Sequence, residues 1–282
     1  ESGGNNEKRF IMVTPLAAGS QAAMESNFVI PSDYKYNGSN RKLIVSVHMY
    51  SPYNFALNAD KSYTKFEESY KIELKNSFRD LYDKYVSMGR QVIIGEMGIV
   101  NKNNTEDRLA WAEYYVSTAR YYHLSSVVWD NGIWDVTSSG EILGELHRDD
   151  LTWNIENLVD NYIQASKTEF HNFAEDFDIE LVDLFDQNQA VVDDGEVEFD
   201  NSITSEKIVE EMKFGWNLGN TLDAINWEAI NDNGLDSETA WGNPKTTEKM
   251  FEALAKKGIK TVRIPVTWRN HLMDKRYTIN PQ

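Results

Sequence analysis

Short apolar runs alternate with longer amphipathic segments along most of this chain. We expect β-strands at six runs rich in β-branched and apolar residues: Arg9–Thr14, Leu43–His48, Val92–Glu96, Ser126–Trp129, Phe214–Leu218 and Thr261–Thr267. Apolar residues at helical spacing predict helices at Phe66–Met88, Thr105–Tyr122, Asn154–Ala165 and Thr246–Lys257, the last ended by Gly258. This succession predicts repeated βα units around a parallel sheet, which is an α/β fold.

The stretch from Thr168 to Asp200 breaks this alternation, because it contains twelve Asp or Glu residues and no Lys or Arg. Apolar residues at helical spacing predict that its first half is an acidic amphipathic helix that docks on the rest of the protein: Phe170, Phe173, Phe177, Leu181 and Leu184. From Gln187 to Asn201 the periodicity is lost, and we expect an exposed connector. A calcium loop is the alternative, but the spaced oxygen ligands and central glycine of such a loop are missing. We therefore divide the chain into 1–165, a connector at 166–201, and 202–282.

Composition and charge narrow the range of partners. The chain has 282 residues and 41% hydrophobic content, which is enough to bury a large core. No apolar run approaches the roughly 18 residues of a membrane span. The formal net charge of −17 would repel nucleic acid and anionic lipid surfaces, so we expect neither as a partner. The 8 Trp and 14 Tyr residues serve either ordinary packing or the binding of sugar rings.

Candidate chemistry gathers at the ends of the predicted strands, where parallel barrel sheets place their active sites. Glu96 ends an apolar strand, and a buried carboxylate needs a partner or a function. Arg263 lies within another apolar strand and needs a carboxylate, for which Glu96 is a candidate. His48 and Tyr50 are two residues apart, so an extended segment points both to one face, and Trp129 ends a further strand. A structural ion pair for Glu96 and a packing role for His48 remain alternatives.

Five motifs on the predicted strands together resemble the endoglucanases of glycoside hydrolase family 5: GWNLGNTLDA, VRIPVTW, VSVHMYSP, IIGEMG and VVWDNG. The similarity covers about residues 1–165 and 202–282. The resemblance implies a (β/α)8 TIM-barrel fold and a retaining mechanism with two catalytic Glu residues. It also implies a β-1,4-glucan substrate such as cellulose, mixed-linkage glucan or xyloglucan, no metal or organic cofactor, and a secreted or cell-surface location.

The resemblance further implies roles for individual residues. Glu96 matches the nucleophile of the family's seventh strand, and Arg263 matches the second-strand arginine that contacts it. His48 and Tyr50 match the sixth-strand pair around the sugar nearest the cut. The remaining matches imply contacts with the substrate. Trp129 matches an indole that stacks on a sugar ring, and the other matches are Asn217, Trp241 and His271.

The order of the motifs departs from that of the family. In family terms the chain runs through strands five to eight, the acidic connector, and strands one and two; no match to strands three and four is found. The Asn-Glu-Pro motif that carries the family's acid/base Glu is missing from the sequence. Because strands one and eight are neighbours in a closed barrel, we still expect Phe214–Leu218 to lie beside Ser126–Trp129.

Three explanations of this order remain open: a circular permutation, a segment across the junction of two tandem catalytic domains, or a chain that continues beyond this sequence. Each predicts a sheet of about six strands with two open edges, so we expect a complementary segment, an unusual closure of the sheet, or self-association that covers these edges. The leading functional hypothesis is a retaining endo-β-1,4-glucanase that is inactive alone for lack of its acid. A noncatalytic glucan-binding module and a structural or engineered barrel segment are the alternatives.

Overall fold

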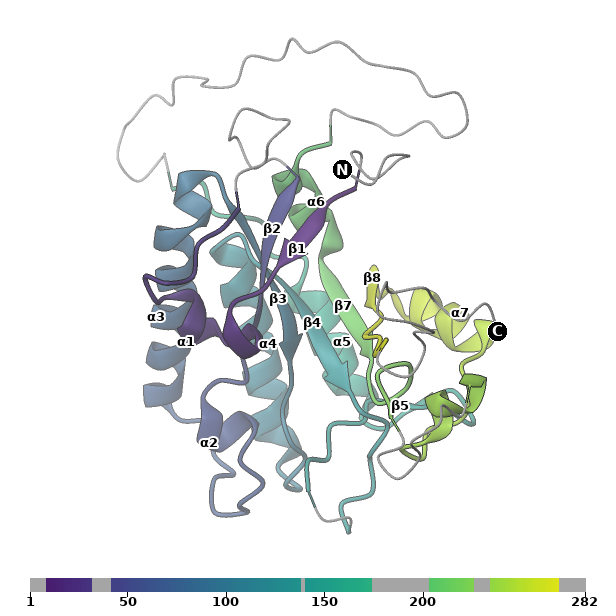
Figure 1. Cartoon of the computed structure of the whole chain (residues 1–282). Coiled ribbons are helices and arrows are strands. Elements are labelled where there is room, and N and C mark those ends of the chain that lie inside the picture. Colours follow the sequence, from purple (N-terminus) through teal and green to yellow (C-terminus); the bar gives the residue numbers. More distant parts are fainter. Residues whose placement is uncertain (1–8, 32–41, 138–139, 174–202, 226–233, 269–282) are drawn as a thin grey trace, which may run out of the picture.

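A computed structural model of the chain describes residues 9–31, 42–137, 140–173, 203–225 and 234–268. Six strands form one sheet in the order β1-β2-β3-β4-β7-β8, and every neighbouring pair is parallel (Figure 1). Their bounds are Ile11–Val13 (β1), Leu43–His48 (β2), Gln91–Met97 (β3), Ser125–Asp130 (β4), Phe214–Leu218 (β7) and Thr261–Arg263 (β8). The α/β class is therefore confirmed, and all six strands end at the same edge of the sheet.

The pairing of β4 with β7 joins the parts of the chain before and after the acidic connector within one sheet. Ser126 is in register with Phe214, and Trp129 is in register with Asn217. The expected neighbourhood of these two strands is confirmed, although the acidic connector separates them in sequence.

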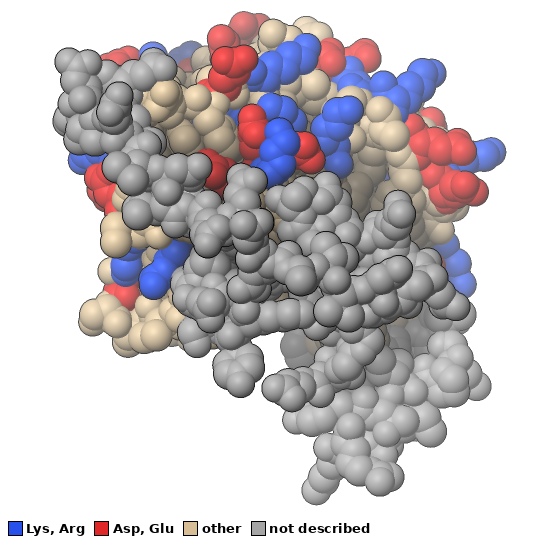
Figure 2. All heavy atoms as spheres, turned by 90° about the horizontal axis from the view of Figure 1, so that it is seen from above, with Lys and Arg blue, Asp and Glu red and all other residues tan. Residues whose placement is uncertain are grey.

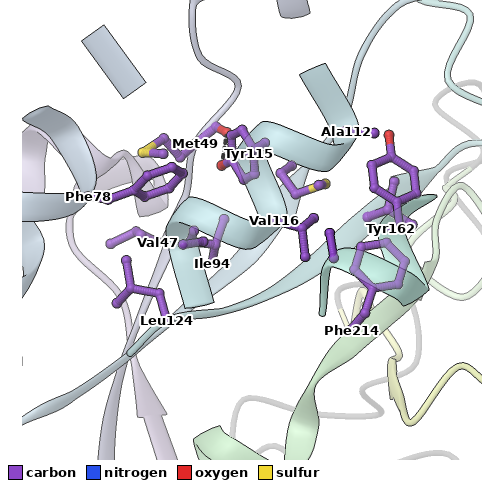
Figure 3. Packing of buried hydrophobic residues seen from close by; sticks show 14 of the residues in the cluster. Val47, Met49, Phe78, Ile94, Ala112, Tyr115, Val116, Leu124, Tyr162 and Phe214 are labelled. Carbon is purple, nitrogen blue, oxygen red and sulfur yellow. Dashed lines mark hydrogen bonds between the residues drawn. The ribbon is translucent and has the colours of Figure 1, made fainter. Parts of the chain in front are cut away.

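The long helices cover one face of this sheet, called here the outer face (Figure 1). They are α3 (Glu68–Lys84), α4 (Thr105–Tyr121) and α5 (Glu156–Ala165), and α7 (Glu248–Lys257) lies beside β8. Figure 3 shows how α4 packs on the strands, with Tyr115 and Val116 facing Val47 and Ile94. The helix stop predicted at Gly258 is confirmed, because this residue has a φ of 109° at the end of α7.

The remaining elements are short. The helices are α1 (Ser20–Ala23) and α2 (Tyr53–Ala56), with 3-10 turns at Leu16–Ala18, Val86–Met88 and Gly234–Thr239. An antiparallel pair, β5 (Leu146–His147) and β6 (Thr152–Trp153), follows the loop after β4. Neither strand of this pair was predicted, because two residues are too few to show an apolar pattern.

The opposite face of the sheet, called here the inner face, is closed at its start by α6 (Ser205–Met212). Val209 of this helix is buried against Ile44, Ile93 and Val127 of three different strands. Helix α6 was not predicted, although its first turn is capped by the Thr204 side chain, which accepts a hydrogen bond from the Lys207 amide at 3.2 Å.

Two predicted elements differ from the structure. Strand β8 ends at Arg263 rather than Thr267, because Pro265 has no N–H to donate to a ladder. The described residues 168–173 of the acidic segment are not helical. Phe170 instead stacks on His123 with ring centroids 4.6 Å apart, and Phe173 packs on Tyr82 at 4.3 Å. Docking is thus confirmed for these two side chains, whereas Phe177, Leu181 and Leu184 lie outside the described residues.

Figure 2 looks onto the end of the sheet at which the strands begin, and acidic and basic side chains are interspersed over the described part of that face. None of the described helices is long and apolar enough to cross a membrane.

Candidate active site

An irregularity in β3 turns Glu96 toward the inner face. Val47 is in register with Ile94, but the next pair is His48 with Glu96, so β3 has one residue more than β2 at this point. Simple alternation from Ile94, which packs on the outer face, would leave Gly95 inward and Glu96 outward. An extra residue of this kind re-aims the side chains that follow it.

Three side chains, from β8, from β2 and from the turn after β2, surround the Glu96 carboxylate. Arg263 Nη1 donates to Oε1 at 2.6 Å, and the Tyr50 hydroxyl donates to Oε2 at 3.1 Å. His48 Nδ1 lies 3.2 Å from Oε2. The Glu96 side chain is 13% exposed, so little solvent competes for its oxygens. The predicted pair of Arg263 and Glu96 is confirmed as a contact, while the catalytic roles of these residues remain predictions.

Burial and neighbouring charges shift the pKa of each of these groups. Burial raises the pKa of Glu96 above its ordinary value, a rise that Arg263 and the Tyr50 hydrogen bond oppose and the charge of Asp223 adds to. Burial and the nearby Arg263 lower the pKa of His48 to about 4. Burial first, and then the charge of Glu96, raise the pKa of Tyr50 far above its usual range. At neutral pH the imidazole is therefore uncharged, and the protonated Tyr50 hydroxyl donates to the carboxylate.

Asn217 lies behind this group, and its expected contact with substrate remains a prediction. It is fully buried. Its Oδ1 accepts a hydrogen bond from Arg263 Nη1 at 2.8 Å, and its Nδ2 donates to the carbonyls of Gly95 and Val128 at 3.0 and 3.1 Å. These hydrogen bonds fix the orientation of the Asn217 amide.

The two indoles that are expected to contact the substrate differ from each other in their surroundings. Trp129 is half-buried, and Gly219 lies so close to it that a Cβ on the glycine would come within 2.8 Å of Cζ2 of the ring. Trp241 is 42% exposed, and its indole N–H donates to the Ile225 carbonyl at 2.9 Å. His271 lies outside the described residues. The substrate contacts of these residues remain predictions.

Sequence reasoning missed a buried network beside Trp129. Asp130 is fully buried, and its Oδ2 accepts from the Trp216 indole at 2.7 Å and from the Leu146 amide at 2.9 Å. Arg148 donates to the Asp130 carbonyl at 2.7 Å and to the Thr221 hydroxyl at 2.8 Å. The WDNG motif contains Asp130, but the partners of Asp130 come from β7 and from residues 146–148, which only the fold brings together.

The site offers a carboxylate that is held by hydrogen-bond donors. Within the described ranges, no group of three or more His, Cys, Asp or Glu residues is placed to hold a metal ion. A carboxylate held by a guanidinium and a hydroxyl can act as a nucleophile in its ionised form, because both donors favour the charged state and fix the orientation of its oxygens.

Several known proteins are similar to this chain in sequence and in fold. The family profile described as Cellulase (glycosyl hydrolase family 5) matches residues 1–134 and 220–282. Endoglucanase B of Clostridium cellulovorans is 34% identical over 168 residues, which cover 58% of this chain and 37% of that protein.

Among solved structures, a GH5-4 broad specificity endoglucanase from Ruminococcus champanellensis with bound cellotriose has 39% identity and a TM-score of 0.51, covering 57% of this chain and 44% of that one. A glycoside hydrolase 5 lichenase from a Caldicellulosiruptor species, in complex with cellotetraose, has 35% identity and a TM-score of 0.54, covering 58% and 44%. The chain thus spans less than half the length of these relatives. The expected (β/α)8-type fold is confirmed, with six parallel strands forming part of a barrel. On the profile match and these similarities, the chain belongs to glycosyl hydrolase family 5.

Proposed function

We propose that this chain carries the nucleophile side of a retaining endo-β-1,4-glucanase site that acts on β-glucans, including xyloglucan, outside the cell. The observation that carries the proposal is the buried Glu96 carboxylate, held by Arg263, Tyr50 and His48 where the parallel strands end. Cellotriose and cellotetraose bound to two structural relatives support a glucan substrate. A net charge of −17 is compatible with a neutral polymer.

In the proposed reaction Glu96 attacks the anomeric carbon of the sugar. A carboxylate oxygen of Glu96 uses a lone pair to form a bond with that carbon. The glycosidic bond breaks at the same time, and the leaving oxygen takes a proton from an acid. Water then cleaves the glycosyl ester and releases the sugar with retained configuration. Arg263 and Tyr50 keep the nucleophile ionised and aligned, and the Trp129 indole stacks on the sugar ring.

We propose that the acid comes from a separate βα segment. The Asn-Glu-Pro motif that would carry it does not occur in this sequence. General acid catalysis contributes about 10²- to 10⁴-fold to a rate, so these residues alone are expected to hydrolyse glucans slower by that factor.

The sheet has room for such a segment at both of its described edges. Strand β1 pairs with β2 only, and β8 pairs with β7 only. Large apolar side chains are exposed beside these edges: Ile11, Met12, Ile264, Val266 and Trp268. Open parallel edges favour association with further strands, and a barrel removes them by closure.

The role of Glu96 can be tested without the acid. The reagent 2,4-dinitrophenyl 2-deoxy-2-fluoro-β-cellobioside has a leaving group that departs unprotonated, and its fluorine slows hydrolysis of the ester that forms. We expect mass spectrometry to find the fluorocellobiosyl group on Glu96 of the full chain and none on Glu96→Gln. Labelling at another residue, or none in the wild type, would overturn the proposal. Cello-oligosaccharide binding without any labelling would favour a noncatalytic glucan-binding module.

The complementary segment has its own test. The part of Clostridium cellulovorans endoglucanase B that spans family strands three and four can be co-expressed with this chain. We expect the two to co-purify and to hydrolyse carboxymethylcellulose faster than either alone. Separate elution and no gain in rate would show that the edges are closed in another way.

A further inference from the structure

We propose that Asn217 is a positioning residue that holds the Arg263 guanidinium against Glu96. The proposal rests on the proposed role of Glu96 as the nucleophile. Arg263 Nη1 donates to Glu96 Oε1 at 2.6 Å and to Asn217 Oδ1 at 2.8 Å. A guanidinium Nη carries two hydrogens, so this one nitrogen can satisfy both acceptors at once.

The amide of Asn217 is itself fixed in orientation. Its Nδ2 donates to the Gly95 carbonyl at 3.0 Å and to the Val128 carbonyl at 3.1 Å, which uses both amide hydrogens. Turning the amide over would place its NH2 group against the guanidinium and leave two buried carbonyls without these donors. Oδ1 therefore faces Arg263.

This amide connects the strand of the nucleophile to the strand of the arginine. Gly95 precedes Glu96 in β3, and Asn217 is in register with Arg263 of β8. In the described sheet β8 is an edge strand with one neighbour, and the Arg263 side chain is 30% exposed. A long side chain at such an edge loses rotamer freedom when it is ordered, so a fully buried acceptor makes its correct orientation more probable.

The charges that face Glu96 show how the loss of Asn217 would change the pKa of Glu96. The groups that act on it are His48 and Tyr50 from β2 and the turn after it, Arg263 from β8, and Asp223 from the segment after β7. Of these four, Arg263 is the one that is cationic at neutral pH. A guanidinium that is held less firmly attracts the charged carboxylate less. The pKa of Glu96 should then rise, because the burial of Glu96 stays the same.

The test is a titration that does not depend on catalysis. Carbon-13 NMR of the full chain follows the Glu96 carboxyl, whose signal is assigned by its loss in Glu96→Gln. We expect Asn217→Ala to raise the pKa of Glu96 by about one unit, and Arg263→Ala to raise it at least as much. The double variant should match Arg263→Ala, because Asn217 acts through the arginine. An unchanged pKa in Asn217→Ala, or shifts that add in the double variant, would overturn the proposal.

A matched control and a second variant keep the test decisive. Asn243 is also buried, and its Nδ2 donates to the carbonyls of Asn131 and Asn220 at 3.1 and 3.0 Å. Asn243→Ala should destabilise the fold but leave the Glu96 titration unchanged. If Asn217→Ala does not fold, Asn217→Ser replaces it in the same cycle with the same expected direction.

The outcomes separate this inference from the proposed function. A positive titration cycle without fluorocellobioside labelling would leave Asn217 as a positioning residue for a carboxylate that is no nucleophile. Labelling of Glu96 together with an unchanged Glu96 pKa in Asn217→Ala would support Glu96 as the nucleophile and exclude the positioning role of Asn217.

Discussion

Arg263 and Glu96 are 167 positions apart in the sequence, yet Nη1 of the arginine donates to Oε1 of the glutamate at 2.6 Å. Their strands are not neighbours, because β4 and β7 lie between β3 and β8. Three interstrand spacings in a flat sheet would separate the backbones by about 14 Å. Together, the curvature of the sheet and the length of the arginine side chain bring the two groups into contact, and this places the carboxylate on the inner face.

Removing the Tyr50 hydroxyl should slow the nucleophile. Tyr50→Phe keeps the ring but loses the donor that lies 3.1 Å from Glu96 Oε2. A hydrogen bond to a charged group contributes about 1.5–3 kcal/mol, so we expect labelling by the fluorocellobioside to slow about ten- to a hundredfold. Tyr53→Phe, at an exposed tyrosine, is the control and should react at the wild-type rate. A wild-type rate in Tyr50→Phe would show that this contact is not needed for attack.

A methyl group at Gly219 should displace the Trp129 indole. The Cβ of Gly219→Ala would lie 2.8 Å from Cζ2 of Trp129 and 2.6 Å from the Asp130 carbonyl. We expect overpacking to cost about 1–3 kcal/mol in urea unfolding and cello-oligosaccharide binding to weaken in calorimetry. Gly19→Ala is the matched control, since its nearest contact is 3.7 Å away. Unchanged affinity in Gly219→Ala would mean that the indole does not bind the sugar in this orientation.

The buried Glu145 should make stability depend on pH. Burial raises its pKa to about 8, although Arg108 Nη2 lies 3.8 Å from its Oε1. The folded state thus binds the proton more tightly than the unfolded state, so the stabilisation is complete below about pH 4.5 and is lost as the pH rises through about 8. Glu145→Gln keeps a neutral side chain.

The prediction for Glu145→Gln is a change in its stability relative to the wild type. Groups common to both proteins cancel in the difference, so the variant should gain free energy of unfolding over the wild type as the pH is raised from about 5 to about 8. Urea denaturation at several pH values measures this gain. A difference that is flat or falls with pH would contradict the assignment.

Arg120 should hold the start of the connector to the barrel. It is buried and donates to the Ser125 hydroxyl at 2.9 Å, the Glu210 carbonyl at 3.1 Å and the Thr168 carbonyl at 3.2 Å. Arg120→Met leaves these acceptors without their donor, and we expect a loss of about 2–4 kcal/mol in urea unfolding. The exposed Arg79→Met should change stability by no more than about 0.5 kcal/mol. Equal stability of the two variants would contradict this role.

The prediction of strands succeeded where packing follows local pattern. The apolar run at Leu43–His48 was predicted with its observed bounds, because five of its six residues are buried on one or other face of the sheet. The prediction failed for the β5–β6 pair, which has two residues in each strand. The prediction of a helix failed for residues 168–173, where Phe170 and Phe173 make aromatic contacts with His123 and Tyr82 instead of helical hydrogen bonds.

The sequence by itself determined the βα repeat, the family, and the residue types at the strand ends, since each depends on short-range pattern. Only the tertiary structure decided which face Glu96 occupies, because the extra residue in β3 is defined by its pairing with β2. It also decided that Asn217 accepts a hydrogen bond from Arg263, a contact that the sequence did not predict. Such contacts depend on strand register and sheet curvature, which join residues far apart in the chain and have no local signal in the sequence.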